Sequence, residues 1–188
     1  PKRLVNLIYS PIEILNSMKP QIDQEKISKN ALSVISKLNK EGFEAYLVGG
    51  CIRDLLAGNV PKDFDIATNA LPQDIKQIFR NSRIVGKRFQ IVHVRSEREI
   101  IEVSTFRRLA PKIIENQSDS GMILRDNSFG SLEEDSLRRD FGINSIYYNP
   151  ISKQFIDLQG GVDDISREVI RSIGPIAVSY THLRAHET

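Results

Sequence analysis

The chain has 188 residues, of which 40% are hydrophobic and 27% charged, a composition typical of a globular protein with one domain or one and a part. A formal net charge of +2 does not by itself indicate a nucleic-acid-binding protein, and no apolar run approaches the ~20 residues that span a membrane. The single cysteine, Cys51, excludes an intramolecular disulfide and gives no sign of an oxidising compartment. We therefore expect a cytoplasmic protein, and the absence of an initial Met suggests a piece of a longer chain.

Hydrophobic periodicity and glycine positions predict the elements of the first half of the chain. In order, these are an extended lead-in (1–23), a helix (24–40) followed by Gly42, a strand (43–48), a turn at Gly49 and Gly50, a helix that stops at Gly58, a strand (63–68), a helix that begins at Pro72, and two strands (89–94 and 99–106). Residues 43–58 are thus expected to form a strand, a glycine turn and a short helix.

The second half of the chain is less regular. Residues 107–130 have no usable period and are rich in Ser, Asn, Asp and Gly, so we expect a functional or mobile loop there. Ser131 and Glu134 have the spacing of a capping box, which predicts a helix running toward Ile146. The remaining expected elements are strands at 153–158 and 168–173 and a turn at 160–165. This order of elements predicts an α+β domain with one small, mostly continuous sheet.

The stretch LVGGCIRDLLAGNVPKDFDIAT (47–68) places two glycines, an arginine and two carboxylates close together. A glycine turn before a helix lets backbone N–H groups approach an anion, and Arg53, one turn into that helix, can reach the same anion. Asp63 and Asp65 are two residues apart, so we expect both on one face of a strand, where they could hold divalent cations bridging to phosphate oxygens. A D-x-D pattern alone can equally be a solvated strand edge. In this context it suits phosphoryl or nucleotidyl transfer with two metal ions.

Other residues have alternative interpretations. Glu102 lies in a strand expected to neighbour the D-x-D strand, and it could complete a metal triad or be a surface residue at the strand end. Cys51 has no adjacent histidine and is interpreted as a packing residue. His93 lies in an apolar strand and is expected to be a core residue rather than a base. Three basic pairs suit either phosphate contacts or solubility: Lys87–Arg88, Arg107–Arg108 and Arg138–Arg139.

Two motifs in this order resemble a known family. LVGGCIRDLLAG (47–58) followed by DFDIAT (63–68) resembles the signature of the DNA polymerase β-type nucleotidyltransferase superfamily. RRDFGINSIYYN (138–149) resembles the second motif of the bacterial poly(A) polymerase and tRNA CCA-adding enzyme family. The resemblance covers roughly residues 24–174. It implies the nucleotidyltransferase head domain of that family, with a small mixed sheet and helices packed mainly on one face.

The same resemblance implies a template-independent RNA nucleotidyltransferase that adds AMP from ATP to RNA 3′ ends with the help of two Mg²⁺ ions. The segment GMILRDNSFGSLEEDSLRRDFGINSIYYN (121–149) is more similar to the poly(A) polymerase branch than to the CCA-adding branch. A CCA-adding enzyme acting on tRNA stays the first alternative. A truncated nucleotide- or RNA-binding module without turnover is the alternative from another class.

Roles for individual residues follow from the resemblance, position by position. The expected catalytic carboxylates are Asp63 and Asp65, which would bind metal, and Asp140, which matches the family's third acidic position. The expected nucleotide contacts are Gly49, Gly50, Arg53, Arg139 and Asn144.

The last residues depart from the family pattern. Residues 175–188, PIAVSYTHLRAHET, stand where the family continues toward helical neck and body regions, so we interpret this tail as not native to the family. His182 and His186 are four residues apart, but the glutamate of an H-E-x-x-H motif is missing and no metal site is assigned to them. Base selectivity and the grip on the RNA primer are expected to lie in regions beyond residue 174.

Overall fold

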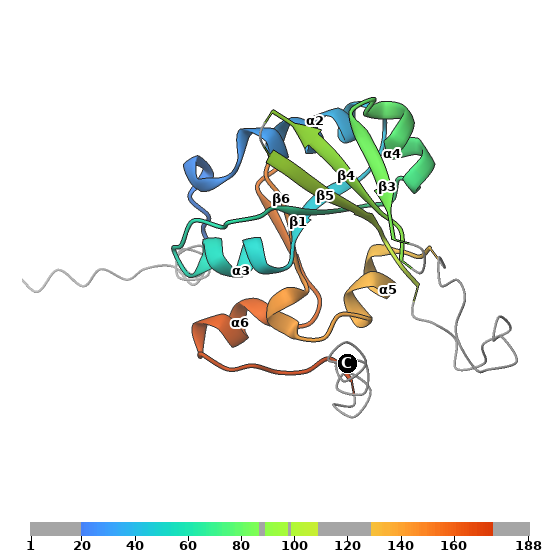
Figure 1. The fold of residues 1–188 in the computed structure, drawn as a ribbon. Helices are drawn as coiled ribbons and strands as arrows, with labels where there is room; N and C mark the ends of the chain where they lie inside the picture. The colour runs from blue at the N-terminus through green and yellow to red at the C-terminus, as the bar shows by residue number, and fades with distance from the viewer. Residues whose placement is uncertain (1–19, 87–88, 98, 109–128, 175–188) are drawn as a thin grey trace, which may run out of the picture.

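The computed structural model describes residues 20–86, 89–97, 99–108 and 129–174. The lead-in up to residue 19, most of the expected 107–130 loop and the 175–188 tail with His182 and His186 lie outside the described residues. The described residues form one mixed sheet with the strand order β3-β4-β5-β2-β1-β6-β7 (Figure 1). No helix within these ranges is long and apolar enough to cross a membrane.

The strands are short and are joined by equally short helices. The strands are β1 (Ala45–Val48), β2 (Asp65–Thr68), β3 (Ser82–Val85), β4 (Ile91–Ser96), β5 (Glu99–Thr105), β6 (Ile146–Asn149) and β7 (Gln154–Asp157). The α-helices are α2 (Lys29–Lys40), α3 (Gly50–Leu56), α4 (Pro72–Ile78), α5 (Leu132–Leu137) and α6 (Gly161–Ser166), with 3₁₀ turns η1 (Gln24–Lys26) and η2 (Gly142–Asn144).

The pairing register determines which side chains share a face of the sheet. β2 and β5 run parallel, and Asp65 is the register partner of Glu102. β4 and β5 run antiparallel, and Glu102 is the partner of His93. His93 is in turn the partner of Arg83 on β3. Because directly opposed residues project to the same side, a row of four polar side chains crosses one face of the sheet.

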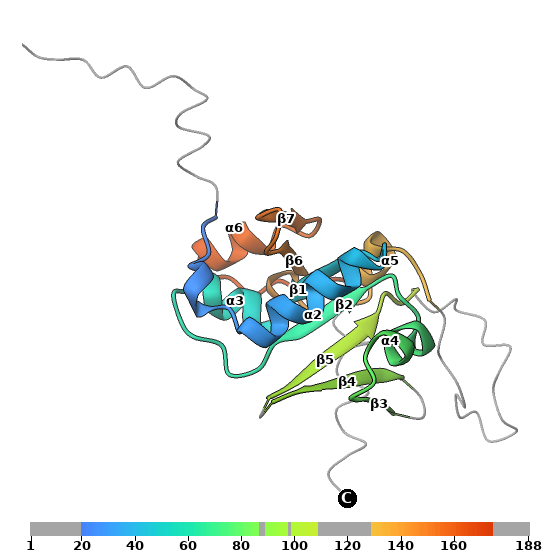
Figure 2. The same ribbon diagram turned by 90° about the horizontal axis from the view of Figure 1, so that it is seen from above.

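The two faces of the sheet are covered unequally. The larger core cluster lies on the face opposite the polar row, where strand residues such as Ile66 and Val103 pack with buried residues of α2, α3 and α4. In Figure 2, α2 lies across the central strands and α4 lies near β3, β4 and β5. On the polar face, a smaller cluster of Val48, Ala67, Phe106, Leu132 and Tyr147 includes one residue of α5. The β3–β5 side of that face contributes no residue to this smaller cluster.

The local signals at two helix boundaries are confirmed. The Ser28 hydroxyl accepts hydrogen bonds from the backbone N–H groups of Asn30 and Ala31 at the start of α2, and Gly42 has φ +88° just past its end. The capping box at α5 is formed by Glu134 N donating to Ser131 Oγ and Ser131 N donating to Glu134 Oε2. Side-chain acceptors at helix starts satisfy N–H groups that have no partner inside the helix.

Four expectations for the elements were wrong. The helix opened by Ser131 ends at Leu137 rather than running toward Ile146, and residues 146–149 form β6, whose first three residues are fully buried. The short strand β3 was not expected. Residues 161–166 form α6 rather than a turn, because the Asp157 carboxylate accepts hydrogen bonds from Gly161 N and Val162 N at the helix start. Residues 168–173 make only an isolated bridge, between Ser172 and Phe141.

Candidate active site

Two carboxylates lie side by side in the middle of the polar face. Asp65 opens β2, and its register partner on β5 is Glu102. Asp63 is exposed and lies two residues before the start of β2, so it is not part of the strand that carries Asp65, and the expectation that both carboxylates share one face stays a prediction. The charge of Asp63 nevertheless raises the pKa of Asp65, which shows that the two carboxylates are near each other.

The electrostatic environment of Asp65 favours a bound cation. Burial is the main cause that raises the pKa of Asp65, and the negative charges of Glu102 and Asp63 raise it further, while the guanidinium of Arg139 lowers it. Like charges held this close repel each other, and a divalent cation between them offsets the repulsion. In the described part of the chain no three His, Cys, Asp or Glu groups converge as a complete metal site. Mg²⁺ takes one or two carboxylates and fills its shell with water and phosphate oxygens, so Asp65 and Glu102 are the residues that could hold it here.

The glycine turn brings the backbone close to these carboxylates. Gly49 has φ +79° and ψ −141°, a conformation that is essentially restricted to glycine. A Cβ atom built on Gly49 would lie 3.7 Å from Asp65 Oδ2 and 4.0 Å from Arg139 Nη1. Gly50 is the first residue of α3, and a Cβ there would lie 3.4 Å from Arg53 Nη2. The turn thus places Gly49 between an acidic and a basic side chain.

Arg139 is held in a buried network around Asp135, a residue that the sequence did not single out. Asp135 is 1% exposed as a side chain and pairs with Arg139 at 3.0 Å and with Arg138 at 2.6 Å. It also accepts a 2.6 Å hydrogen bond from the Tyr147 hydroxyl and one from Arg107 N. Burial alone would raise the pKa of Asp135, but both arginines and the Tyr147 hydroxyl hold that pKa below its usual value.

The sequence spacing of Asp135, Arg138 and Arg139 could have predicted that these three side chains interact. Arg138 and Arg139 follow Asp135 by three and four positions, the distances at which side chains on a helix meet. Tyr147 has no comparable sequence signal, because it reaches the site only when β6 pairs with β1. Asp135 therefore acts as a structural anchor that orients both arginines.

A chain of hydrogen bonds connects the remaining predicted nucleotide contacts. Arg53 Nη1 donates to Asn144 Oδ1 at 3.2 Å, and Asn144 Nδ2 donates to Asp140 Oδ1 at 3.2 Å. The Asn144 carbonyl oxygen accepts from Arg139 Nη1 at 3.4 Å. The structure therefore brings Gly49, Arg53, Arg139, Asn144 and Asp140 into one continuous group. The carboxylate beside Asp65 is that of Glu102, and the role of Asp140 as a catalytic carboxylate stays a prediction.

A small cavity lies between the carboxylates and the arginines. It has a volume of about 150 Å³ and is lined by Val48, Asp65, Ile91, Glu102, Ser104, Arg107, Arg138 and Arg139. A cavity lined by two acidic and three basic side chains suits a ligand that carries both phosphate groups and a divalent cation. Of the three arginines, only Arg139 had been assigned to the nucleotide from the sequence.

The burial of Cys51 and of His93 tests whether each is a packing residue of the core, as the sequence predicted. Cys51 is buried, and burial raises the pKa of its thiol to about 12, so the prediction of a packing residue is confirmed. The prediction that His93 is a core residue was wrong. Its side chain is 34% exposed, with Nε2 at 3.3 Å from Glu102 Oε1, because it alternates with the buried Val92 and Val94 on β4.

Comparison with known proteins identifies the family. Residues 45–171 match the poly A polymerase head domain family, and the chain belongs to this family. It is 51% identical over 158 residues to poly(A) polymerase I of Salmonella typhi. The aligned region covers 81% of this chain and 34% of the relative. It is 39% identical over 159 residues to a CCA-adding enzyme of Enterococcus faecalis, covering 85% of this chain and 36% of the relative.

A solved structure shows the same fold. The CCA-adding enzyme of Bacillus stearothermophilus, determined in complex with CTP, superposes with a TM-score of 0.61 at 39% identity, covering 77% of this chain and 33% of that one. The expected fold class, an α+β head with a mixed sheet, is therefore confirmed. The chain spans about a third of the length of the curated relatives it matches.

Proposed function

We propose that the chain is the catalytic head of a template-independent RNA nucleotidyltransferase that adds AMP from ATP to RNA 3′ ends. The observation that carries the proposal is the cavity in which Asp65 and Glu102 face Arg107, Arg138 and Arg139. Nucleotidyl transfer requires a triphosphate and divalent cations at one place, and this cavity supplies basic groups for the first and acidic groups for the second. A protein consuming ATP and RNA would work in the cytoplasm.

The chemistry at the site is an in-line displacement. The 3′-oxygen of the RNA forms a bond to the α-phosphorus of ATP, the bond from that phosphorus to the bridging oxygen breaks, and pyrophosphate leaves. Mg²⁺ ions, when bound by Asp63 and Asp65, would promote ionisation of the 3′-hydroxyl and neutralise the triphosphate. Glu102 is placed to share that task, since it is the register partner of Asp65.

The basic side chains of the site would orient the triphosphate. Arg139 is fixed by Asp135 and Tyr147, so little conformational entropy remains to be lost when it binds a phosphate group. Arg53 is 42% exposed and linked to Arg139 through Asn144. Gly49 leaves room for the ligand between Asp65 and Arg139.

Addition of C and A to tRNA is the second candidate function. Relatives named CCA-adding enzymes match most of this chain at 39% identity, against 51% for the poly(A) polymerase I named above. The higher identity to poly(A) polymerase I favours ATP as the nucleotide. A nucleotide-binding head without turnover is the candidate from another class, since the chain spans only 34% of that relative.

A primer-extension assay tests these candidates directly. The chain is incubated with labelled RNA, Mg²⁺ and each nucleoside triphosphate separately, with an Asp63→Ala/Asp65→Ala double variant as the control. Long tails from ATP alone that disappear in the double variant are expected. Incorporation of CTP into a truncated tRNA would assign the chain to the CCA-adding reaction. Mg²⁺-dependent ATP binding without extension would leave the head as a binding module.

A further inference from the structure

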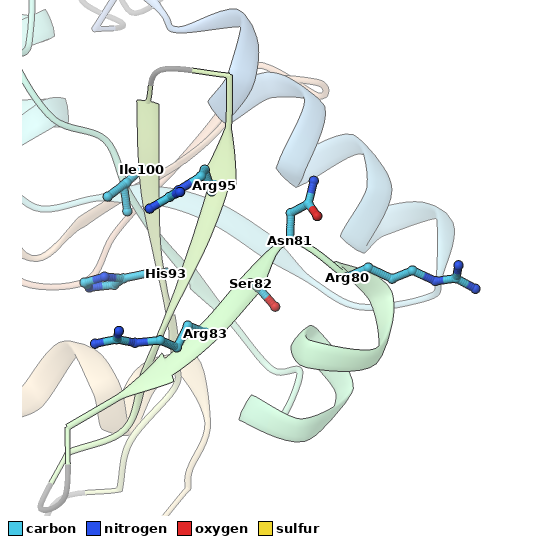
Figure 3. Close-up of a pocket in the computed structure, with 7 residues that line it drawn as sticks. All are labelled: Arg80, Asn81, Ser82, Arg83, His93, Arg95 and Ile100. Atoms are coloured by element: carbon cyan, nitrogen blue, oxygen red, sulfur yellow. The ribbon is translucent and has the colours of Figure 1, made fainter.

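A second group of side chains occupies the polar face beyond the carboxylates, toward the β3 edge of the sheet. Arg83, His93, Arg95 and Ile100 lie on one side of β3, β4 and β5, whereas Arg80 points away from them (Figure 3). With residues 80–82 they line a depression of about 470 Å³. We call these four residues the β3–β5 platform.

The register connects the platform to the candidate active site. Arg83 is the partner of His93, and His93 is the partner of Glu102. Arg95 is the partner of Ile100, two residues further along the same two strands and on the same face. Because Glu102 is also the register partner of Asp65, the platform and the carboxylates lie on adjacent strands and on the same face of the sheet.

The charge of the platform is positive and available to a ligand. Arg83 and Arg95 are exposed, and none of the ion pairs between described residues includes either guanidinium. The acidic group that faces the platform is Glu102, paired with His93. The nearby Glu99 is directed to the α2 side of the sheet, where it accepts hydrogen bonds from Ser28 and Asn30.

The platform also offers apolar surface next to these charges. Ile100 is the second residue of β5 and is 48% exposed, whereas Ile101 and Val103 on the same strand are buried in the core. An exposed aliphatic side chain beside a guanidinium group suits a nucleotide chain, whose phosphates need cations and whose bases or riboses need an apolar contact.

The carboxylates lie between two basic regions, and this arrangement separates the two substrates. Toward β1 is Arg139, which lies close to the Cβ position of Gly49. Toward β3 are Arg83 and Arg95. An in-line displacement needs the attacking oxygen and the leaving pyrophosphate on opposite sides of the α-phosphorus. With the triphosphate on the Arg139 side, the attacking strand therefore arrives from the β3 side.

We propose that the β3–β5 platform binds the 3′-terminal segment of single-stranded RNA, with Arg83 and Arg95 contacting backbone phosphates upstream of the reacting 3′-hydroxyl. This inference rests on the proposed function for the identity of the second substrate. The contacts are to phosphate and to one aliphatic side chain, so binding is expected to depend strongly on salt and weakly on base sequence.

Fluorescence anisotropy with a 5′-fluorescein-labelled oligoadenylate, over a series of KCl concentrations, tests the platform. The Arg83→Gln/Arg95→Gln double variant is expected to bind RNA about tenfold more weakly and to reduce the slope of log K against log salt by about 1.4, the value for two lost phosphate contacts on a single strand. The matched control is Arg80→Gln, which removes an exposed charge from the same depression but on the far side of the strands. This control is expected to retain wild-type affinity.

Two further measurements keep the result interpretable. The Arg83→Lys/Arg95→Lys variant keeps both charges and is expected to restore the salt slope, which a purely structural role would not predict. Mg²⁺-dependent ATP binding is expected to be unchanged in the Gln variant. Wild-type RNA affinity in the Arg83→Gln/Arg95→Gln variant would overturn the inference. So would a double-stranded competitor that displaces the probe as well as a single-stranded one does. If the wild-type chain extends no primer but its RNA binding needs both arginines, the proposed function fails and the platform stands.

Discussion

At the scale of single residues, Gly49 determines how closely the backbone turn approaches the charged side chains. Its φ of +79° with ψ −141° costs an L-residue about 1–3 kcal/mol, and the space above it is bounded by Asp65 and Arg139. Two separate penalties therefore apply to any side chain at this position. The first lowers the free energy of unfolding. The second lowers the affinity for a ligand that must enter between the acidic and the basic group.

The Gly49→Ala variant separates these two penalties when it is compared with Gly42→Ala. Gly42 also has positive φ, at +88°, but has nothing within 4 Å of its Cβ position. Both variants are expected to lose about 1–3 kcal/mol of unfolding free energy, measured by urea denaturation. Only Gly49→Ala is expected to weaken Mg²⁺-dependent ATP binding. Equal nucleotide affinity in the two variants would show that the methyl group does not reach the ligand.

Asp135 is the second residue with a large expected effect. It is 1% exposed and neutralises two arginines that are themselves mostly buried. Removing one partner of a buried ion pair leaves the other charge uncompensated, so Asp135→Asn is expected to lose about 3 kcal/mol of unfolding free energy at neutral pH. The control is Asp163→Asn, since Asp163 pairs with Arg167 at 51% and 68% exposure and should cost less than about 0.5 kcal/mol.

The same carboxylate predicts a pH dependence of stability. The pKa of Asp135 is lower in the folded state than its usual value. Its contribution to stability is therefore present above the ordinary carboxyl pKa of about 3.9 and is lost as pH falls through the folded-state pKa. Urea denaturation of the wild-type chain below that pH should therefore show a loss of stability that Asp135→Asn lacks. Parallel pH profiles for the two proteins would contradict this assignment.

At the scale of elements, predictions held where the signal was local and failed where a partner was distant. The ends of α2 and the start of α5 are set by Ser28, Gly42 and Ser131 within one turn, and the sequence predicted them. β6 depends on pairing with β1, about a hundred residues earlier, and the helix that begins after Ser131 was expected to run up to its first residue, Ile146. Gly160 and Gly161 were read as part of a turn, whereas the carboxylate that caps α6 comes from Asp157, four residues before Gly161.

Substitution of Asp157 tests that explanation for α6. Its carboxylate accepts hydrogen bonds from Gly161 N at 2.8 Å and Val162 N at 2.9 Å. Asp157→Ala leaves both donors without this acceptor and is expected to cost about 1–2 kcal/mol of unfolding free energy. Gly161 N and Val162 N donate to different carboxylate oxygens, so Asp157→Asn keeps an acceptor for only one of them and should cost an intermediate amount. An unchanged unfolding free energy in Asp157→Ala would contradict the capping role.

At the scale of the whole molecule, the sheet collects the site from segments that are far apart in the sequence. Asp65, Glu102 and His93 come from three strands and meet through register alone. The motif residues Gly49, Asp65 and Arg139 could be predicted because two family motifs contain them. The placement of Glu102 beside Asp65 was one of the two alternatives that the sequence offered. The placement of Arg107 and the β3–β5 platform could not be predicted, since it depends on strand order and on which face α2 and α4 leave uncovered.

The repulsion between the carboxylates on this face predicts that Asp65, a proposed metal ligand, lowers the stability of the folded chain. Asp65 is partly buried and repelled by Glu102 and Asp63, so its charge destabilises the folded chain in the absence of a cation. Asp65→Asn is therefore expected to raise the unfolding free energy at neutral pH by about 1 kcal/mol. Calorimetry or urea denaturation without added Mg²⁺ measures this change, and a loss of stability would contradict it.

The most direct test of the central claim is isothermal titration of ATP into the wild-type chain and Asp65→Asn, each with and without Mg²⁺. If the acidic and basic groups together form a nucleotide-binding active site, the wild-type chain will bind ATP with a strong dependence on Mg²⁺, and Asp65→Asn will lose that dependence while remaining folded. Undiminished Mg²⁺-dependent binding in Asp65→Asn would contradict the assignment of this carboxylate, and with it the proposed active site.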